Sequence, residues 1–181
     1  MKKRLLIVLL CLLLAVSACG KTEIRPTTDE PAAETEAQTL SFETTDLNGN
    51  AVSSEELFSS HKITMVNVMT TWCTYCIQEL PELQELSKTY AGKDCAIVGI
   101  LYDGTDDTLI ETGRSLMEQA GASYPVLLPW DGMETQIPVQ AFPTTFFVNS
   151  AGEIVGETIL GAEPARYTAQ LDTLLAQMAE S

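Results

Sequence analysis

The sequence has few basic residues and little histidine, and both shortages bear on function. Its 10 Lys and Arg stand against 25 Asp and Glu, and His61 is the single histidine. Nucleic-acid binding needs a basic surface that neutralises phosphates, so we expect no nucleic-acid partner. A zinc site draws roughly four ligands, mostly Cys and His, and the chain offers one histidine and no second C-x-x-C pair. We therefore expect neither a metal nor a bound cofactor.

The longest apolar run lies at the N-terminus and has the pattern of a signal peptide. Residues 2–4 are basic, residues 5–16 are apolar, and Ser17 and Ala18 are small. The run is too short to span a bilayer as a mature helix. It ends in VSAC, which resembles a bacterial lipobox, so we predict a lipoprotein signal peptide over residues 1–18, with Cys19 carrying a membrane anchor. The alternative is ordinary secretory cleavage nearby, and either route places the protein outside the cytoplasm.

Residues 19–38 have scarcely an apolar side chain and are rich in Thr, Glu, Ala and Pro. Such a composition cannot bury enough surface to fold, so we predict a flexible tether. Loss of the signal peptide leaves seven Lys and Arg against 25 Asp and Glu, a net charge of −18. Most of these acidic residues are expected to form a solvated surface around a single domain at residues 39–181.

Cysteine is scarce within that domain, which contains only Cys73, Cys76 and Cys95. Three thiols cannot form the several bridges of a disulfide-stapled secreted domain. A hydrophobic core must hold the fold instead, and the 45% hydrophobic content suffices for one domain. Cys95 begins an apolar run, so we expect it to be a buried thiol that packs as a small hydrophobe.

Hydrophobic periodicity predicts alternating strands and helices. Asn48-Gly49, between two short extended runs, indicates a β-hairpin, and Ser53 or Ser54 is expected to cap a short helix after it. The strands expected after it are residues 63–70, 95–102, 124–129 and a hairpin at 143–160; the helices are residues 77–90, 106–119 and 165–178. This order predicts an α/β fold with a mixed β-sheet flanked by helices on both faces.

The stretch TTWCTYCIQEL places Cys73 and Cys76 where a buried strand gives way to a helix. The unpaired N–H groups at a helix start stabilise a thiolate, so Cys73 is the better nucleophile. Cys76 lies one turn further in, placed to attack a mixed disulfide at Cys73. Haem attachment would need histidine rather than Ile77, and a merely structural bridge over so short a loop removes little chain entropy. We interpret the pair as a redox-active disulfide.

From Leu40 to Met178 the sequence resembles the thioredoxin superfamily, and within it the TlpA- and ResA-like membrane-anchored thiol–disulfide oxidoreductases. Four segments carry the resemblance: DLNGNAVSSEEL, NVMTTWCTYCIQELPEL, the strand and helix from Cys95 to Gln119, and FPTTFFVNSAGEIV. The pairing of W-C-x-x-C with P-T-T about 70 residues later is specific, whereas C-x-x-C alone is not. The resemblance implies a thioredoxin-like fold with a central βα insertion, in which Pro143 is a cis-proline that faces the cysteines.

The resemblance also implies roles for residues around the pair. Asn67 occupies the position of a buried Asp in thioredoxin, and an amide cannot take up a proton. Glu79 matches the acidic residue of extracytoplasmic reductases, which implies that it handles the proton of Cys76; the alternative is a solvated glutamate on a helix. Tyr75 replaces the usual proline before the second cysteine, and Met69 replaces the first of two tryptophans.

The residues expected to contact a client protein are aromatic or belong to the cis-proline segment. Trp72 and Phe142 would form a rim beside the cysteines. The full set is Trp72, Tyr75, Phe142, Pro143 and Thr144.

The predicted function is reduction of disulfides in extracytoplasmic client proteins, with electrons from a membrane thiol carrier of the CcdA type. Apocytochrome c and a methionine sulfoxide reductase are possible clients. The alternatives are a disulfide oxidase or isomerase, and a thioredoxin-like copper-delivery protein. Copper delivery in that family uses a longer C-x-x-x-C pair and a downstream histidine, whereas His61 lies upstream. A peroxidase of the peroxiredoxin type would need proline in place of Val66.

Overall fold

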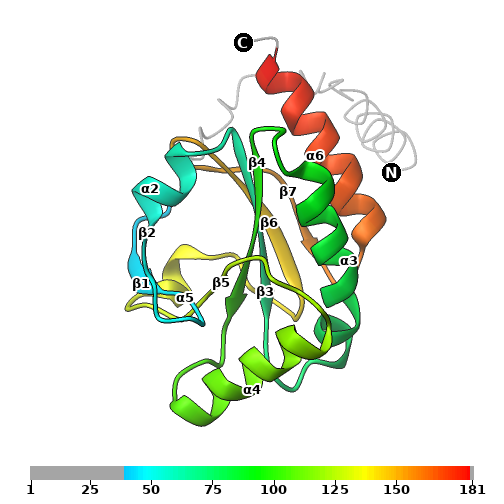
Figure 1. Cartoon of the computed structure of the whole chain (residues 1–181). Helices are drawn as coiled ribbons and strands as arrows, with labels where there is room; N and C mark the ends of the chain where they lie inside the picture. The colour runs from blue at the N-terminus through cyan, green and yellow to red at the C-terminus, as the bar shows by residue number, and fades with distance from the viewer. Residues whose placement is uncertain (1–38, 180–181) are drawn as a thin grey trace, which may run out of the picture. The chain divides into compact units, whose positions relative to one another are not determined.

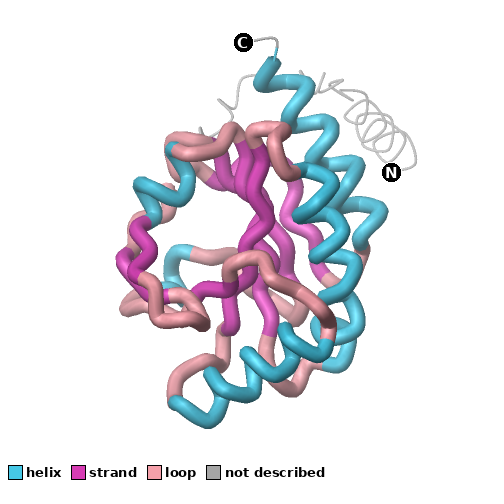
Figure 2. The backbone as a smooth tube through the Cα atoms, in the orientation of Figure 1, coloured by secondary structure: helices cyan, strands magenta, loops and turns pink. Residues whose placement is uncertain are grey.

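The computed structural model describes residues 39–179; the predicted signal peptide, Cys19 and the whole of the predicted tether lie outside them. The centre of the domain is a five-stranded mixed sheet with strand order β5-β4-β3-β6-β7 (Figure 1). Helices flank this sheet on both sides (Figure 2), and a separate two-stranded sheet precedes it in the chain. The mixed sheet predicted from the sequence is confirmed.

The middle strand, β3 (Ile63–Met69), is buried along its whole length. It runs parallel to β4 (Cys95–Leu101) and antiparallel to β6 (Thr144–Asn149). Neighbouring side chains of a strand point to opposite faces, so Met65 and Met69 join one hydrophobic cluster and Val66 and Val68 join the other. Asn67 lies between the two methionines and shares their face, which is an unusual place for a polar side chain.

Three helices cover the face that carries Met65 and Met69. They are α3 (Thr74–Tyr90), α4 (Asp107–Gln119) and α6 (Pro164–Ala179), and each contributes buried residues to that cluster. The opposite face is covered by two short helices, α2 (Ser54–Ser59) and α5 (Met133–Gln136), together with the segment around Phe42. The core is thus two apolar layers with the sheet between them.

The N-terminal hairpin closes one edge of the sheet. Its strands are β1 (Glu43–Thr45) and β2 (Ala51–Ser53), and Gly49 in the turn has a φ of +84°, which glycine adopts without strain. The Leu47 N–H donates to the Val126 carbonyl at 2.8 Å, beside β5 (Val126–Leu127). The hairpin therefore occupies backbone groups of an edge strand that would otherwise be free to pair with another chain.

The last strands follow the prediction closely. β6 and β7 (Ile154–Leu160) form an antiparallel hairpin, and α6 follows it. Two differences appear: β5 is only two residues long, and α5 was not predicted. Within residues 39–179, no helix is both long and apolar enough to cross a bilayer.

Candidate active site

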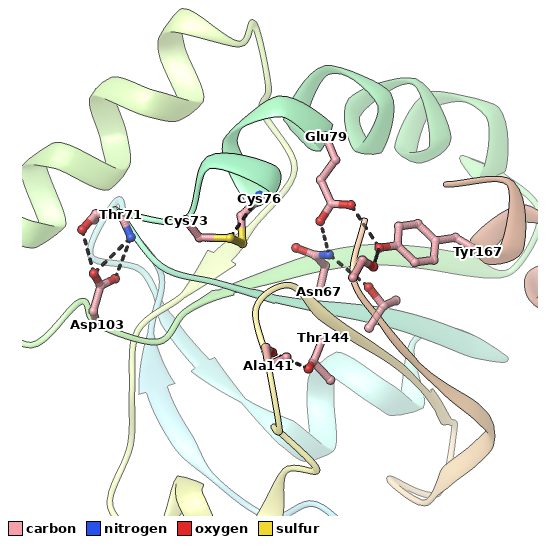
Figure 3. The surroundings of a disulfide bond; sticks show 11 residues. Asn67, Thr71, Cys73, Cys76, Glu79, Asp103, Ala141, Thr144 and Tyr167 are labelled. Carbon is pink, nitrogen blue, oxygen red and sulfur yellow. Dashed lines mark hydrogen bonds between the residues drawn. A yellow bond between two sulfur atoms is a disulfide. The ribbon is translucent and has the colours of Figure 1, made fainter. Parts of the chain in front are cut away.

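The two cysteines lie at the carboxyl end of β3, where the chain turns into α3. Cys73 is the N-cap residue of α3, and its sulfur accepts a hydrogen bond from the Cys76 N–H at 3.2 Å. The two sulfur atoms form a disulfide, with Cα atoms 5.3 Å apart (Figure 3). Cys73 is 5% exposed and Cys76 is fully buried. An incoming thiolate therefore reaches Cys73 more easily than Cys76, and the order of attack stays a prediction.

The loop before Cys73 is held by a carboxylate from the next strand. Asp103 follows β4, and its two oxygens accept the Thr71 N–H, each at 3.0 Å. The Thr71 hydroxyl donates to the same carboxylate at 2.6 Å. Since the carboxyl ends of parallel strands meet at one edge, this contact fixes the loop against β4 two residues before the cysteine.

Glu79 lies beneath the disulfide and is buried, with 3% of its surface exposed. It is three residues after Cys76 on α3, so both side chains share one face of the helix. Asn67 Nδ2 donates to Glu79 Oε1 at 2.8 Å and to Thr145 Oγ1 at 3.0 Å (Figure 3). The alternative of a solvated helix glutamate is therefore wrong.

Burial raises the pKa of Glu79 to about 7, because the ionised carboxylate loses its hydration. Hydrogen bonds from Asn67 and Tyr167 oppose this rise, and the nearby charge of Glu82 adds to it. A carboxyl group with a pKa near neutrality can both take up and release a proton under ordinary conditions, which general acid–base catalysis requires.

Tyr167, on α6, completes this network and was not predicted from the sequence. Its hydroxyl lies 3.0 Å from Glu79 Oε2 and 2.8 Å from the Gly161 carbonyl oxygen, and it accepts the Glu163 N–H at 3.1 Å. Burial raises the pKa of Tyr167 to about 12, so its proton stays on at neutral pH. Tyr167 is 88 residues from Glu79 in the sequence, and no local motif links the two.

The cis-proline segment and two aromatic residues surround the cysteines. The Phe142–Pro143 peptide bond is cis, as the resemblance implied. The Trp72 and Phe142 rings meet edge to face, with centroids 5.7 Å apart. Trp72 is 69% exposed and Tyr75 is 67% exposed, so two large apolar side chains face solvent on either side of Cys73.

Thr144 is placed differently from the other predicted contact residues. Its side chain is fully buried, and its hydroxyl donates to the Ala141 carbonyl at 2.6 Å. Pro143 is also buried. The side chain of Thr144 therefore stabilises the cis-proline segment from within and does not reach the surface, whereas Trp72 and Tyr75 do.

The other cysteine and the histidine lie away from the pair. Cys95 is free and buried at the opposite end of β4, and burial raises its pKa to about 12. His61 precedes β3, whereas the cysteines follow it, and a seven-residue strand separates the two by roughly 20 Å. In residues 39–179 no group of three or more His, Cys, Asp and Glu side chains is arranged to hold a metal.

The model of the AhpC/TSA family matches residues 35–156 of this chain. The chain belongs to the AhpC/TSA family. Thioredoxin-like protein YneN of Bacillus subtilis (strain 168) is 28% identical over 93 residues, which are 51% of this chain and 54% of that protein. Thiol-disulfide oxidoreductase ResA of Bacillus thuringiensis (strain Al Hakam) is 28% identical over 165 residues, 90% of this chain and 91% of that protein.

The fold of this AhpC/TSA family member is also that of solved thioredoxin-like structures. A thiol:disulfide interchange protein of the thioredoxin family from Chlorobium tepidum TLS superposes with a TM-score of 0.65 at 24% identity, covering 79% of this chain and 99% of that one. The predicted resemblance to the thioredoxin superfamily is confirmed. With its relatives of the ResA type and its Cys73–Cys76 disulfide, the chain is a thiol–disulfide oxidoreductase.

Proposed function

We propose that this protein reduces disulfides in extracytoplasmic client proteins, using the Cys73–Cys76 pair as its dithiol. The observation that carries the proposal is the position of the disulfide: Cys73 caps α3 near the surface, and buried Glu79 lies one turn below Cys76. An attacking sulfur, a resolving sulfur and a proton acceptor are thus aligned along one helix.

The reaction proceeds in two exchanges. In the reduced protein, the Cys73 thiolate attacks a client disulfide, forms a mixed disulfide and releases one client thiolate. Cys76 then loses its proton to the Glu79 carboxylate, and its sulfur attacks Cys73. The second client thiolate leaves, takes up a proton, and the Cys73–Cys76 disulfide forms again. The client gains two electrons from the cysteine pair. Its two thiolates take up two protons, one that Glu79 releases after receiving it from Cys76 and one from solvent, because the Cys73 thiolate had already lost its own.

The direction of transfer is supported by the charges beside the pair. Figure 3 shows the carboxyl groups of Asp103 and Glu79 on either side of the cysteines, and the whole chain is strongly acidic. Negative charge disfavours a thiolate, and a less stabilised thiolate makes the disulfide form relatively more stable. That balance is typical of a reductant. The N-terminal end of α3 acts in the opposite sense, so the charges support the sign of the effect and not its size.

The proposed location and partners are supported by the sequence. The lipobox-like VSAC at residues 16–19 supports a lipoprotein anchored to the cell membrane through Cys19, with residues 19–38 as a tether. A dithiol that works outside the cytoplasm needs electrons delivered through the membrane, which a thiol carrier of the CcdA type would supply. Apocytochrome c and a methionine sulfoxide reductase remain the proposed clients.

Two serine variants test the reaction. Cys76→Ser should trap a mixed disulfide at Cys73, visible as a covalent adduct on a non-reducing gel and by mass spectrometry, while Cys73→Ser should abolish exchange without an adduct. Cys95→Ser serves as the matched control, because its thiol is buried outside the site. Equal loss from both site variants with no adduct from either would refute the assigned order of attack.

A further inference from the structure

The Tyr167 hydroxyl has more acceptors than protons. It lies within hydrogen-bond distance of two acceptors, Glu79 Oε2 at 3.0 Å and the Gly161 carbonyl at 2.8 Å. A phenol carries one proton, so it can donate to only one of them at a time. The Glu163 N–H already donates to the phenol oxygen at 3.1 Å, and the Thr145 hydroxyl also faces this oxygen, so a proton on Glu79 would compete with Thr145 for the second lone pair.

The protonation state of Glu79 decides which acceptor receives that proton. When Glu79 is ionised, Tyr167 donates to Oε2, because a hydrogen bond to a charged acceptor is the stronger of the two. When Glu79 carries a proton on Oε2, that proton is donated to the phenol oxygen, and Tyr167 turns its own proton toward Gly161. The facing Glu79 and Tyr167 oxygens are hydrogen-bonded to each other in both states.

The second acceptor is held in place by the backbone. Gly161 has a φ of +87°, in the left-handed region that favours glycine. Its N–H donates to the Pro143 carbonyl at 2.8 Å, while its own carbonyl faces Tyr167. The carbonyl that accepts the Tyr167 proton when Glu79 is protonated is therefore tied, through the Gly161 N–H, to the cis-proline segment.

We propose that Tyr167 is the positioning residue for Glu79, and that its hydroxyl switches between Glu79 and Gly161 as Glu79 takes up and releases the Cys76 proton. The proposal rests on the proposed function, in which Glu79 is the proton acceptor. Tyr167 has no part in the sulfur chemistry itself in this scheme; it acts through the Glu79 carboxyl group, to which it is hydrogen-bonded.

Glu79 is also influenced by polar groups on every element packed around it. Besides Tyr167, these groups are Glu82 on α3, Asn67 on β3, Thr145 on β6 and Tyr124 just before β5. Asn67 donates to Oε1 and to Thr145 with its two amide protons, so it cannot reverse its role when Glu79 is protonated. Tyr167 is the group bonded to Glu79 that can both donate and accept.

Tyr167→Phe tests the switch, because it removes the hydroxyl and keeps the ring. The titration of Glu79 is followed in the oxidised full-length protein through the side-chain carboxyl carbon of ¹³C-labelled glutamate, assigned by its absence in Glu79→Gln. The ionised carboxylate loses a donor, so the midpoint should rise by about one pH unit, a tenfold change in proton affinity. The rising limb of the pH–rate profile for client reduction should move the same way.

Tyr90→Phe is the matched control. Tyr90 is a buried tyrosine on α3 whose hydroxyl donates to the Asp172 carboxylate at 2.7 Å, but it does not contact Glu79. Its removal should leave the Glu79 midpoint unchanged. Incorporation of 3-fluorotyrosine at position 167 gives a second arm that preserves packing: a more acidic phenol is a stronger donor, so the midpoint should fall.

The outcomes separate the switch from the proposed function. An unchanged Glu79 midpoint in Tyr167→Phe, or equal shifts in Tyr167→Phe and Tyr90→Phe, would overturn the role of Tyr167. A wild-type protein that does not reduce protein disulfides would overturn the proposed function, whatever the midpoint does. The combination we expect is active wild type, a raised midpoint in Tyr167→Phe, a lowered one with 3-fluorotyrosine, and no change in Tyr90→Phe.

Discussion

The buried carboxyl of Glu79 predicts an unusual dependence of stability on pH. Its pKa rises from 4.5 to about 7 on folding, so the folded protein binds this proton more tightly than the unfolded chain does. The stabilisation is fully present below pH 4.5 and is lost as the pH rises through about 7. A shift of this size corresponds to about 3 kcal/mol of unfolding free energy.

Glu79→Gln removes the titratable carboxyl group that causes this pH dependence and keeps a side chain of the same shape. The oxygen of the introduced amide can accept from Asn67, and its nitrogen can donate to the Tyr167 oxygen, as a protonated glutamate would. We therefore expect the variant and the wild type to be about equally stable near pH 4.5. Above pH 7.5 the variant should be the more stable of the two by about 3 kcal/mol.

Urea denaturation of the oxidised domain, residues 39–181, measures this difference at half-unit steps of pH. Working with the disulfide intact removes the cysteine pair from the titration, and subtracting the two curves cancels every other ionisable group. Glu118→Gln makes the same change of charge at an exposed site on α4 and is the matched control. A Glu79→Gln difference curve that does not change with pH would show that Glu79 is solvated in solution and would refute its proton-handling role.

Three further predictions concern the surroundings of the cysteines. Asp103→Ala should lower the free energy of unfolding by about 1–3 kcal/mol and slow exchange with dithiothreitol, because the Thr71 N–H and hydroxyl lose their acceptor. Asp107→Ala, at an exposed site, is the control, and equal effects of the two variants would refute the role of Asp103 in holding the loop before Cys73. Iodoacetamide at pH 8 should label reduced Cys73 in the native protein and Cys95 only after denaturation, since the Cys95 pKa is about 12; comparable native rates would contradict this. Trp72→Ala should lower kcat/KM for a protein client several-fold yet leave dithiothreitol exchange nearly unchanged, and equal losses would argue against a client-binding rim.

Much of the fold could be predicted because its central elements are long and strongly patterned. β3 is a continuous apolar run, and the change to helical spacing after Trp72 locates the start of α3 to within a few residues. α5 has only four residues, too few for any periodicity, and it forms because Met133 packs into the second core layer. Short elements of this kind depend on tertiary contacts that sequence reasoning cannot see.

The site was predictable only in part, for a related reason. Cys73, Cys76 and Glu79 fall within seven residues, and one local motif indicates all three. Tyr167 reaches Glu79 from a helix near the C-terminus, and a tyrosine in an amphipathic helix looks like an ordinary core residue. Thr144 shows the opposite case: the motif indicated that it belongs to the site, but its inward orientation depends on the hydrogen bond to Ala141.

The redox midpoint of the Cys73–Cys76 couple tests the proposed reductase function most directly. The protein is equilibrated with glutathione or dithiothreitol buffers of known potential, and the change in fluorescence of Trp72, the tryptophan next to the disulfide, reports the reduced fraction. We predict a midpoint closer to the roughly −270 mV of thioredoxin than to the roughly −120 mV of DsbA. A midpoint at the oxidising end would contradict the reductase function and would favour the oxidase or isomerase alternative.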